Sequence, residues 1–167
     1  RAEWMNAFIT TYIERDLPFL FDVKFSSVTM RKLWTMLAHL QGTILNAENL
    51  GRSLDITGTT LKRYLDYLEG AFIITRLQPF YVNLGKRLVK SPKLYINDTG
   101  VLHFLLNIFD KKELVSHPVL GASWETYVLS QINYAKNNRI DTYFYRTQVG
   151  AECDVVLSRG HVVKACI

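Results

Sequence analysis

Three carboxylates in the C-terminal third have residue types and a spacing that could bind a metal ion. Glu152 and Asp154 lie two residues apart in 152–158, where the apolar pattern predicts a strand. Side chains two apart in a strand share one face, and an Asp in a largely buried strand is costly unless it binds a metal or hydrogen bonds. Glu125 lies upstream on a predicted apolar helix, 121–137. Carboxylate oxygens suit Mg²⁺, so Glu125, Glu152 and Asp154 are candidate catalytic residues, with Glu125 and Asp154 as metal ligands.

The carboxylates lie on predicted elements that follow one another as one helix and three strands. The helix 121–137 is followed by predicted strands at 142–147, 152–158 and 161–167. A helix with Glu and a second strand with Asp resembles the PD-(D/E)XK nuclease core, whose carboxylates hold Mg²⁺ that activates water. That core also needs Glu-x-Lys on the third strand, but Val162 stands two residues before Lys164. An alternative stays open, in which Glu152 and Asp154 only cap the strand or pair with Arg146 or Arg159.

A second set of functional candidates lies in the N-terminal part. A short helix at 46–54 with Asn46 as its N-cap, a tight turn at 55–58 and a longer helix at 59–69 with Gly70 as its C-cap precede two predicted strands, 71–77 and 93–96. This is the order of a winged helix-turn-helix. The second helix exposes side chains suited to phosphates and base edges, namely Thr59, Thr60, Lys62 and Arg63. The alternative is a winged helix that serves as a protein-docking or structural module.

The charge distribution favours nucleic acid as a partner. Residues 71–97 hold five basic side chains and no acidic one, which equals the net charge of +5 of the whole chain. A basic hairpin is what a phosphate backbone attracts. We therefore add Lys86, Arg87, Lys90 and Lys93 to the predicted DNA-binding residues. The alternative is a hairpin that lysines merely keep soluble.

The remaining pattern predicts an α+β protein of two parts. Helices are expected at 3–15, broken by Asp16-Leu17-Pro18, at 27–40, ended by Gly42, and at 99–107, with a loop at 111–118. We expect a helical winged-helix domain at 1–100. A truncated restriction-endonuclease-like α/β domain is expected at 101–167.

Composition and missing motifs exclude several classes of protein. The chain has 167 residues, 49% of them hydrophobic, so wholesale disorder is excluded. It has no apolar run long enough to span a membrane, no signal peptide at its start and only two cysteines, which favours a reducing cytoplasm. The only Gly-Lys pair, Gly85-Lys86, is not part of a P-loop. The first residue is Arg1 and the last residues are apolar, so we expect a piece of a longer protein.

Several blocks together resemble a known family. They are 11–18 (TYIERDLP), 86–95 (KRLVKSPKLY), 98–100 (DTG), 121–125 (GASWE), 145–147 (YRT) and 150–157 (GAECDVVL). In this order, across nearly the whole chain, they are similar to the domain of unknown function 4143, which lies C-terminal to AAA-family ATPases of bacteria and archaea. The resemblance implies a winged helix followed by a PD-(D/E)XK-like half, with the ATPase upstream and Glu-x-Lys directly after Ile167. Cys153, where that family more often has an aliphatic residue, is expected to serve packing alone.

From these patterns we expect the DNA-binding and nuclease-like region of an ATPase, not catalytic by itself. No cofactor is expected in this chain, Mg²⁺ belongs to the full-length protein, and ATP binds only through the ATPase domain. The expected partners are duplex DNA, that ATPase domain and a second copy of the chain, without a membrane. Two alternatives are a protein-interaction or oligomerisation module without DNA contact, and a Mg²⁺-dependent nuclease in the full-length protein.

Overall fold

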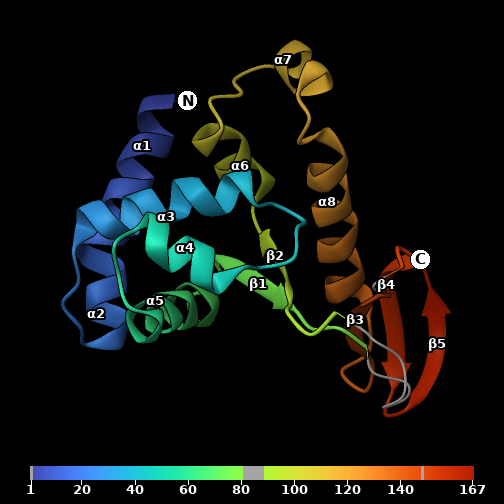
Figure 1. Ribbon diagram of the computed structural model, residues 1–167. Helices are drawn as coiled ribbons and strands as arrows, with labels where there is room; N and C mark the ends of the chain where they lie inside the picture. The colour runs from blue at the N-terminus through green and yellow to red at the C-terminus, as the bar shows by residue number, and fades with distance from the viewer. Residues whose placement is uncertain (1, 81–88, 148) are drawn as a thin grey trace.

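The computed structural model describes residues 2–80, 89–147 and 149–167. The N-terminal part is mostly helical and contains one two-stranded sheet (Figure 1). Its elements are α1 (Ala2–Thr11), the π-helix η1 (Tyr12–Asp16), α2 (Leu17–Phe21), α3 (Ser27–His39), α4 (Ala47–Ser53), α5 (Gly58–Gly70), β1 (Ile74–Leu77), β2 (Lys93–Ile96), α6 (Thr99–Leu105) and α7 (Lys111–Ser116).

The C-terminal part consists of a long helix and a small sheet. The helix α8 (Leu120–Ala135) precedes β3 (Asp141–Arg146), β4 (Glu152–Arg159) and β5 (Val162–Cys166), which pair antiparallel in the order β3-β4-β5. Figure 1 shows α8 between the N-terminal helices and this sheet. β1 and β2 also pair antiparallel, with Ile74 opposite Ile96. The predicted α+β class is therefore confirmed.

Side-chain caps explain where the middle helices begin. The Asn46 side chain accepts a hydrogen bond from the Asn49 amide at the start of α4, and Thr57 accepts one from the Thr60 amide at the start of α5. Each cap satisfies an N–H group that has no partner within the helix. The predicted helix, turn and helix over 46–69 are confirmed.

The predicted break at Asp16-Leu17-Pro18 is wrong. The chain stays helical through this stretch, because η1 leads directly into α2 and Pro18 lies in the first turn of α2. A proline is tolerated there, since its missing N–H would have no helical partner in any case. The helical run ends instead at Asp22, which adopts a left-handed backbone with φ of 48°.

The predicted loop at 111–118 is also wrong, because α7 forms there. Asp110 accepts a hydrogen bond from the Glu113 amide, while the Glu113 carboxylate accepts one from the amide of Phe109. The two acidic side chains thus hold the start of α7 in a variant of the capping box, in which Glu113 binds the amide of the residue before the N-cap. The Asp-x-x-Glu spacing was the signal that could have predicted this helix.

Two apolar clusters hold the elements together. The larger one joins α1, α3, α5, β1 and α6, and contains Trp34, Leu61 and Leu102. The smaller one joins β1 and β2 to α8, β3 and β4 through Leu77, Tyr95, Leu129, Phe144 and Val155. Alternate residues of β2 therefore face different clusters, and β2 connects the two parts of the chain. The boundary at 100/101 stays a prediction.

In the part of the chain that the structure describes, no helix has the length and apolarity that a membrane crossing requires.

Candidate functional site

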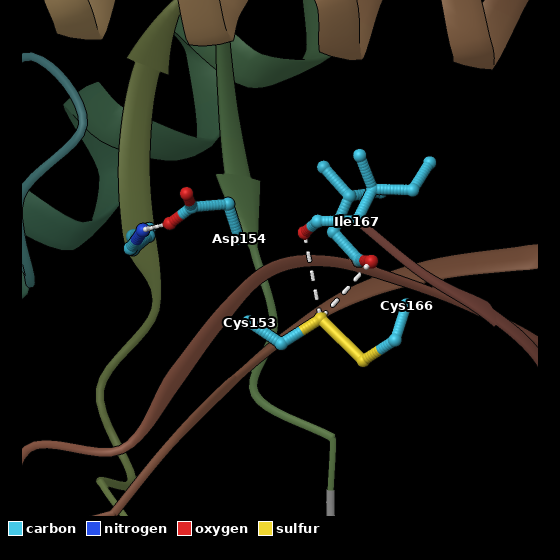
Figure 2. The surroundings of a disulfide bond; sticks show 6 residues. Cys153, Asp154, Cys166 and Ile167 are labelled. Atoms are coloured by element: carbon cyan, nitrogen blue, oxygen red, sulfur yellow. Dashed lines mark hydrogen bonds and ion pairs between the residues drawn. A yellow bond between two sulfur atoms is a disulfide. The ribbon is translucent and has the colours of Figure 1, made fainter.

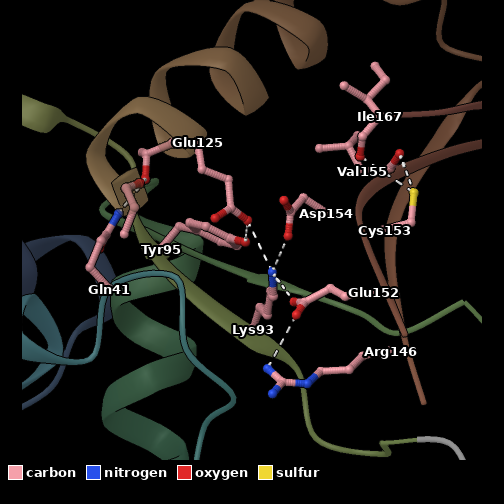
Figure 3. Close-up of polar contacts among 12 residues, drawn as sticks. Gln41, Lys93, Tyr95, Glu125, Arg146, Glu152, Cys153, Asp154, Val155 and Ile167 are labelled. Carbon is pink, nitrogen blue, oxygen red and sulfur yellow. Dashed lines mark hydrogen bonds and ion pairs between the residues drawn. The ribbon is translucent and has the colours of Figure 1, made fainter. Parts of the chain in front are cut away.

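The candidate site is built around one buried lysine, Lys93, the first residue of β2. Its side chain is only 3% exposed. Side chains alternate along a strand, so Lys93 and Tyr95 share one face of β2 while Leu94 and Ile96 enter the larger core. The face with Lys93 and Tyr95 is turned toward α8 and β4 (Figure 3).

The structure brings the three predicted carboxylates together on the Lys93 ammonium. Lys93 Nζ lies 3.2 Å from Glu125 Oε1, 2.7 Å from Glu152 Oε1 and 2.8 Å from Asp154 Oδ1. Figure 3 shows these side chains converging from α8 and β4 on the nitrogen. An ammonium group has three N–H donors, and here it has one carboxylate for each of them.

Charge compensation dominates the electrostatics of the cluster. Burial alone would lower the pKa of Lys93, but hydrogen bonds to Asp154 and Glu152 and the charge of Glu125 outweigh it and raise that pKa. Arg146 Nη1 adds a second positive charge, 3.6 Å from Glu152 Oε2. The Lys93 nitrogen also lies 5.7 Å from the centre of the Phe144 ring. The lysine is thus held in its charged form.

Neighbouring polar groups fix Glu125 and β2 relative to each other. The Tyr95 hydroxyl donates a hydrogen bond to Glu125 Oε1. Burial, and then this hydrogen bond, raise the pKa of Tyr95 far above its ordinary value, so the phenol stays protonated. Buried Gln41 donates to Thr126 Oγ1 at 2.6 Å and accepts from the Ile96 amide at 2.8 Å. These bonds tie the middle of α8 to β2 next to the site.

The residues do not fit Mg²⁺ as they are arranged. The carboxylate oxygens that would bind the ion converge on Lys93, and Glu125 Oε1 also accepts from Tyr95. Mg²⁺ needs an octahedron of oxygens at about 2.0–2.1 Å, which a central ammonium prevents. Within 2–80, 89–147 and 149–167, no group of three or more His, Cys, Asp or Glu residues is arranged to hold a metal ion.

A disulfide joins the strand that carries two of the carboxylates to its neighbour. Cys153 lies between Glu152 and Asp154 on β4 and is bonded to Cys166 on β5, with the two Cα atoms 6.3 Å apart (Figure 2). That separation is within the range disulfides adopt. The expectation that Cys153 serves packing alone is therefore corrected, while a cytoplasmic location stays a prediction.

The predicted DNA-binding residues have different surroundings. On α5, Thr59, Lys62 and Arg63 are exposed and Thr60 is partly buried, with Arg63 donating to the Tyr67 hydroxyl at 3.2 Å. Lys90 is exposed, whereas Lys86 and Arg87 lie outside the described residues. Lys93 differs from the expectation, because its ammonium is buried and bound to three carboxylates. In this arrangement it cannot reach a phosphate.

The basic segment 71–97 is also less positive in space than in sequence. Arg76 binds Asp66, at 2.7 Å, and Glu69, both on α5. Lys93 is likewise balanced by carboxylates outside the segment. Counting charges along the chain missed these partners, since they lie up to 61 residues away.

Two family models match different parts of the chain. A family model described as a domain of unknown function, DUF8612, matches residues 1–112, and another, DUF4143, matches residues 120–166. The predicted resemblance to DUF4143 is thus confirmed for the C-terminal part, whereas the first two thirds match a different family.

Two mycobacterial proteins are similar to the chain. They are the uncharacterized protein Rv2008c of Mycobacterium tuberculosis and the uncharacterized protein Mb2031c of Mycobacterium bovis, each 47% identical over 156 residues. The match covers 92% of this chain but only 34% of each relative. The chain therefore spans about a third of the length of the curated relatives it matches.

Proposed function

This chain belongs to the family of the domain of unknown function DUF8612, and we propose that its helix pair α4–α5 binds duplex DNA as part of a winged helix. The observation that carries the proposal is the exposed face of the first half of α5, which presents Thr59, Lys62 and Arg63. Side chains near the start of a second helix are the ones that reach base edges in helix-turn-helix proteins. The antiparallel pair β1–β2 follows α5, as the wing does in that fold.

We further propose that this region belongs to a longer AAA-family ATPase and does not cleave DNA by itself. The relatives extend far beyond the matched part, which leaves room for an ATPase module. A nuclease-like C-terminal half is supported by the order of α8 and β3–β5 and by carboxylates on α8 and β4. Lys93 at the centre of these carboxylates favours a non-catalytic state. The domains proposed are residues 1–100 and 101–167.

DNA binding is tested by measuring affinity against salt concentration. We expect a dissociation constant of about 10⁻⁴–10⁻⁶ M for a fluorescent duplex, weakening as NaCl rises from about 50 to 200 mM. Replacing Lys86, Arg87 and Lys90 together by Ala should flatten the slope of log K against log salt by up to about 3 units. Fluorescence anisotropy measures both quantities.

A matched control removes charge elsewhere on the surface. Lys111 and Lys112 are exposed on α7, which lies far from α5 (Figure 1). Lys111→Ala with Lys112→Ala should leave the slope nearly unchanged. An equal loss of slope per charge in both variants would mean that DNA contacts are spread over the surface. No change of affinity in the triple variant would contradict the assignment of the basic hairpin.

A protein-interaction or oligomerisation module is the second candidate function. The observation that favours it is a pair of exposed aromatic side chains on α8, Trp124 and Tyr127, whose ring centres lie 5.6 Å apart. Sedimentation velocity distinguishes the two candidates. Self-association that Trp124→Ala abolishes, without any binding of duplex DNA at low salt, would support the interaction module and contradict the DNA proposal.

A further inference from the structure

The centre of the carboxylate cluster already contains a cation that belongs to the chain. Lys93 Nζ contacts Glu125, Glu152 and Asp154 at 2.7–3.2 Å, and its side chain is almost completely buried. The ammonium therefore uses all three of its N–H donors inside the cluster. This buried cation is an observation separate from the clustering of acids, and it shows that the three carboxylates bind a positively charged group.

We propose that Lys93 is a built-in counter-ion that closes this cluster to divalent cations. An ammonium and a metal ion would compete for the same oxygen lone pairs, and their like charges would repel at such short range. The Tyr95 hydroxyl strengthens the closure, because it occupies the same oxygen of Glu125 that Lys93 contacts. The proposal does not depend on DNA binding.

The charges indicate what the cluster accepts once Lys93 is absent. Three carboxylates face Lys93 and the more distant Arg146. Without the ammonium, the carboxylates carry a negative charge that a hard divalent cation with oxygen ligands can balance. Removing one side-chain charge should therefore turn a closed cluster into a metal site.

The closing residue comes from a different part of the chain than the carboxylates. Lys93 lies on β2, within the part that matches DUF8612, whereas Glu125, Glu152 and Asp154 lie within the part that matches DUF4143. Metal access thus depends on the packing of β2 against α8 and β4. Separation of these elements would withdraw Lys93 and Tyr95 together, since both are on one face of β2 (Figure 3).

The test compares Mn²⁺ binding to the full chain and to Lys93→Met by isothermal titration calorimetry. Met keeps a long unbranched side chain without the charge. We expect Lys93→Met to bind Mn²⁺ at least about tenfold more tightly than the unchanged protein. Lys93→Arg should stay closed, because it keeps the cation, and Asp154→Asn in the Lys93→Met background should weaken the gained binding again.

Two outcomes would overturn the proposal. One is Mn²⁺ binding by the unchanged protein as tight as in Lys93→Met, and the other is metal-dependent nicking of plasmid DNA by the unchanged protein that Asp154→Asn abolishes.

If Lys93→Met does not fold, lysine acylation followed by mass spectrometry gives a second measurement on the unchanged protein. Lys93 should react more slowly than exposed Lys111, with or without Mn²⁺. Faster labelling of Lys93 in Mn²⁺ would show that the metal displaces it and would contradict closure.

Discussion

Replacing Leu61 by Ala is expected to lower the free energy of unfolding by about 2–5 kcal/mol. Leu61 is completely buried in the larger apolar cluster, and one of its methyl groups lies 3.8 Å from the position that a Cβ on Gly51 would occupy. It therefore packs α5 against α4. Ala would leave a cavity that these two short helices can only partly fill. Urea denaturation, followed by circular dichroism, measures the change.

Lys62→Ala is the matched control, because Lys62 is the next residue of α5 and is exposed. It should change stability little, since surface substitutions away from caps and networks usually do. The two variants together test the rotation of α5, on which the proposed DNA contacts depend. A larger loss of stability in Lys62→Ala than in Leu61→Ala would mean that the exposed face of α5 is assigned wrongly.

Local sequence patterns predicted most of the helices and strands. Helical periodicity, with Asn46 as the expected cap of α4, predicted α4 and α5 within one or two residues, because the start of a helix is largely decided by neighbours in the chain. The Thr57 cap of α5 was not predicted, since Thr57 was assigned to the turn. Patterns that depend on tertiary packing were predicted less well. Gly70 was expected to cap α5 from just beyond the helix, but it lies inside the helix as its last residue. The residue with a left-handed backbone is Phe72, with φ of 60°.

The reason for Gly70 is a contact that the sequence does not reveal. A Cβ at this position would lie 3.1 Å from the ring of Phe21, which is tighter than side chains normally allow. Glycine is therefore needed for the close approach of α2 to α5 rather than for a left-handed turn. Only the packing of a segment about 50 residues away decides between these two roles.

The sequence predicted the three carboxylates of the candidate site but not the lysine at its centre, Lys93. The period of two in β4 placed Glu152 and Asp154 on one face, as the structure has them. Lys93 was assigned to DNA because a count along the chain finds only basic neighbours. A buried charge needs a partner. Lys93 begins the apolar run Lys93-Leu94-Tyr95-Ile96, and this position in a buried strand is the signal in the sequence that indicates an acidic partner.

Replacing Lys93 by Met is expected to cost about 3 kcal/mol of stability, even where no metal is present. Removing one partner of a buried ion pair typically costs about 3–5 kcal/mol, because the remaining charge is left without compensation. The lower end applies here, since Asp154 is 53% exposed and water can reach it when the ammonium is gone. The midpoint of urea denaturation, in buffer with a chelator, measures this loss.

A double-mutant cycle separates the ionic contribution from simple packing. If mutual repulsion of the carboxylates causes the loss, Asp154→Asn should cost less in the Lys93→Met background than in the unchanged protein, with a coupling energy of about 1–3 kcal/mol. High salt should reduce the loss only in part, because it screens the repulsion at Asp154, which is 53% exposed, but not the attraction of Lys93, which is only 3% exposed. Additive effects of the two substitutions would show that the Lys93–Asp154 contact contributes little. The apolar packing of Tyr95 on β2 against Phe144 on β3 would then hold these strands together without help from that ion pair.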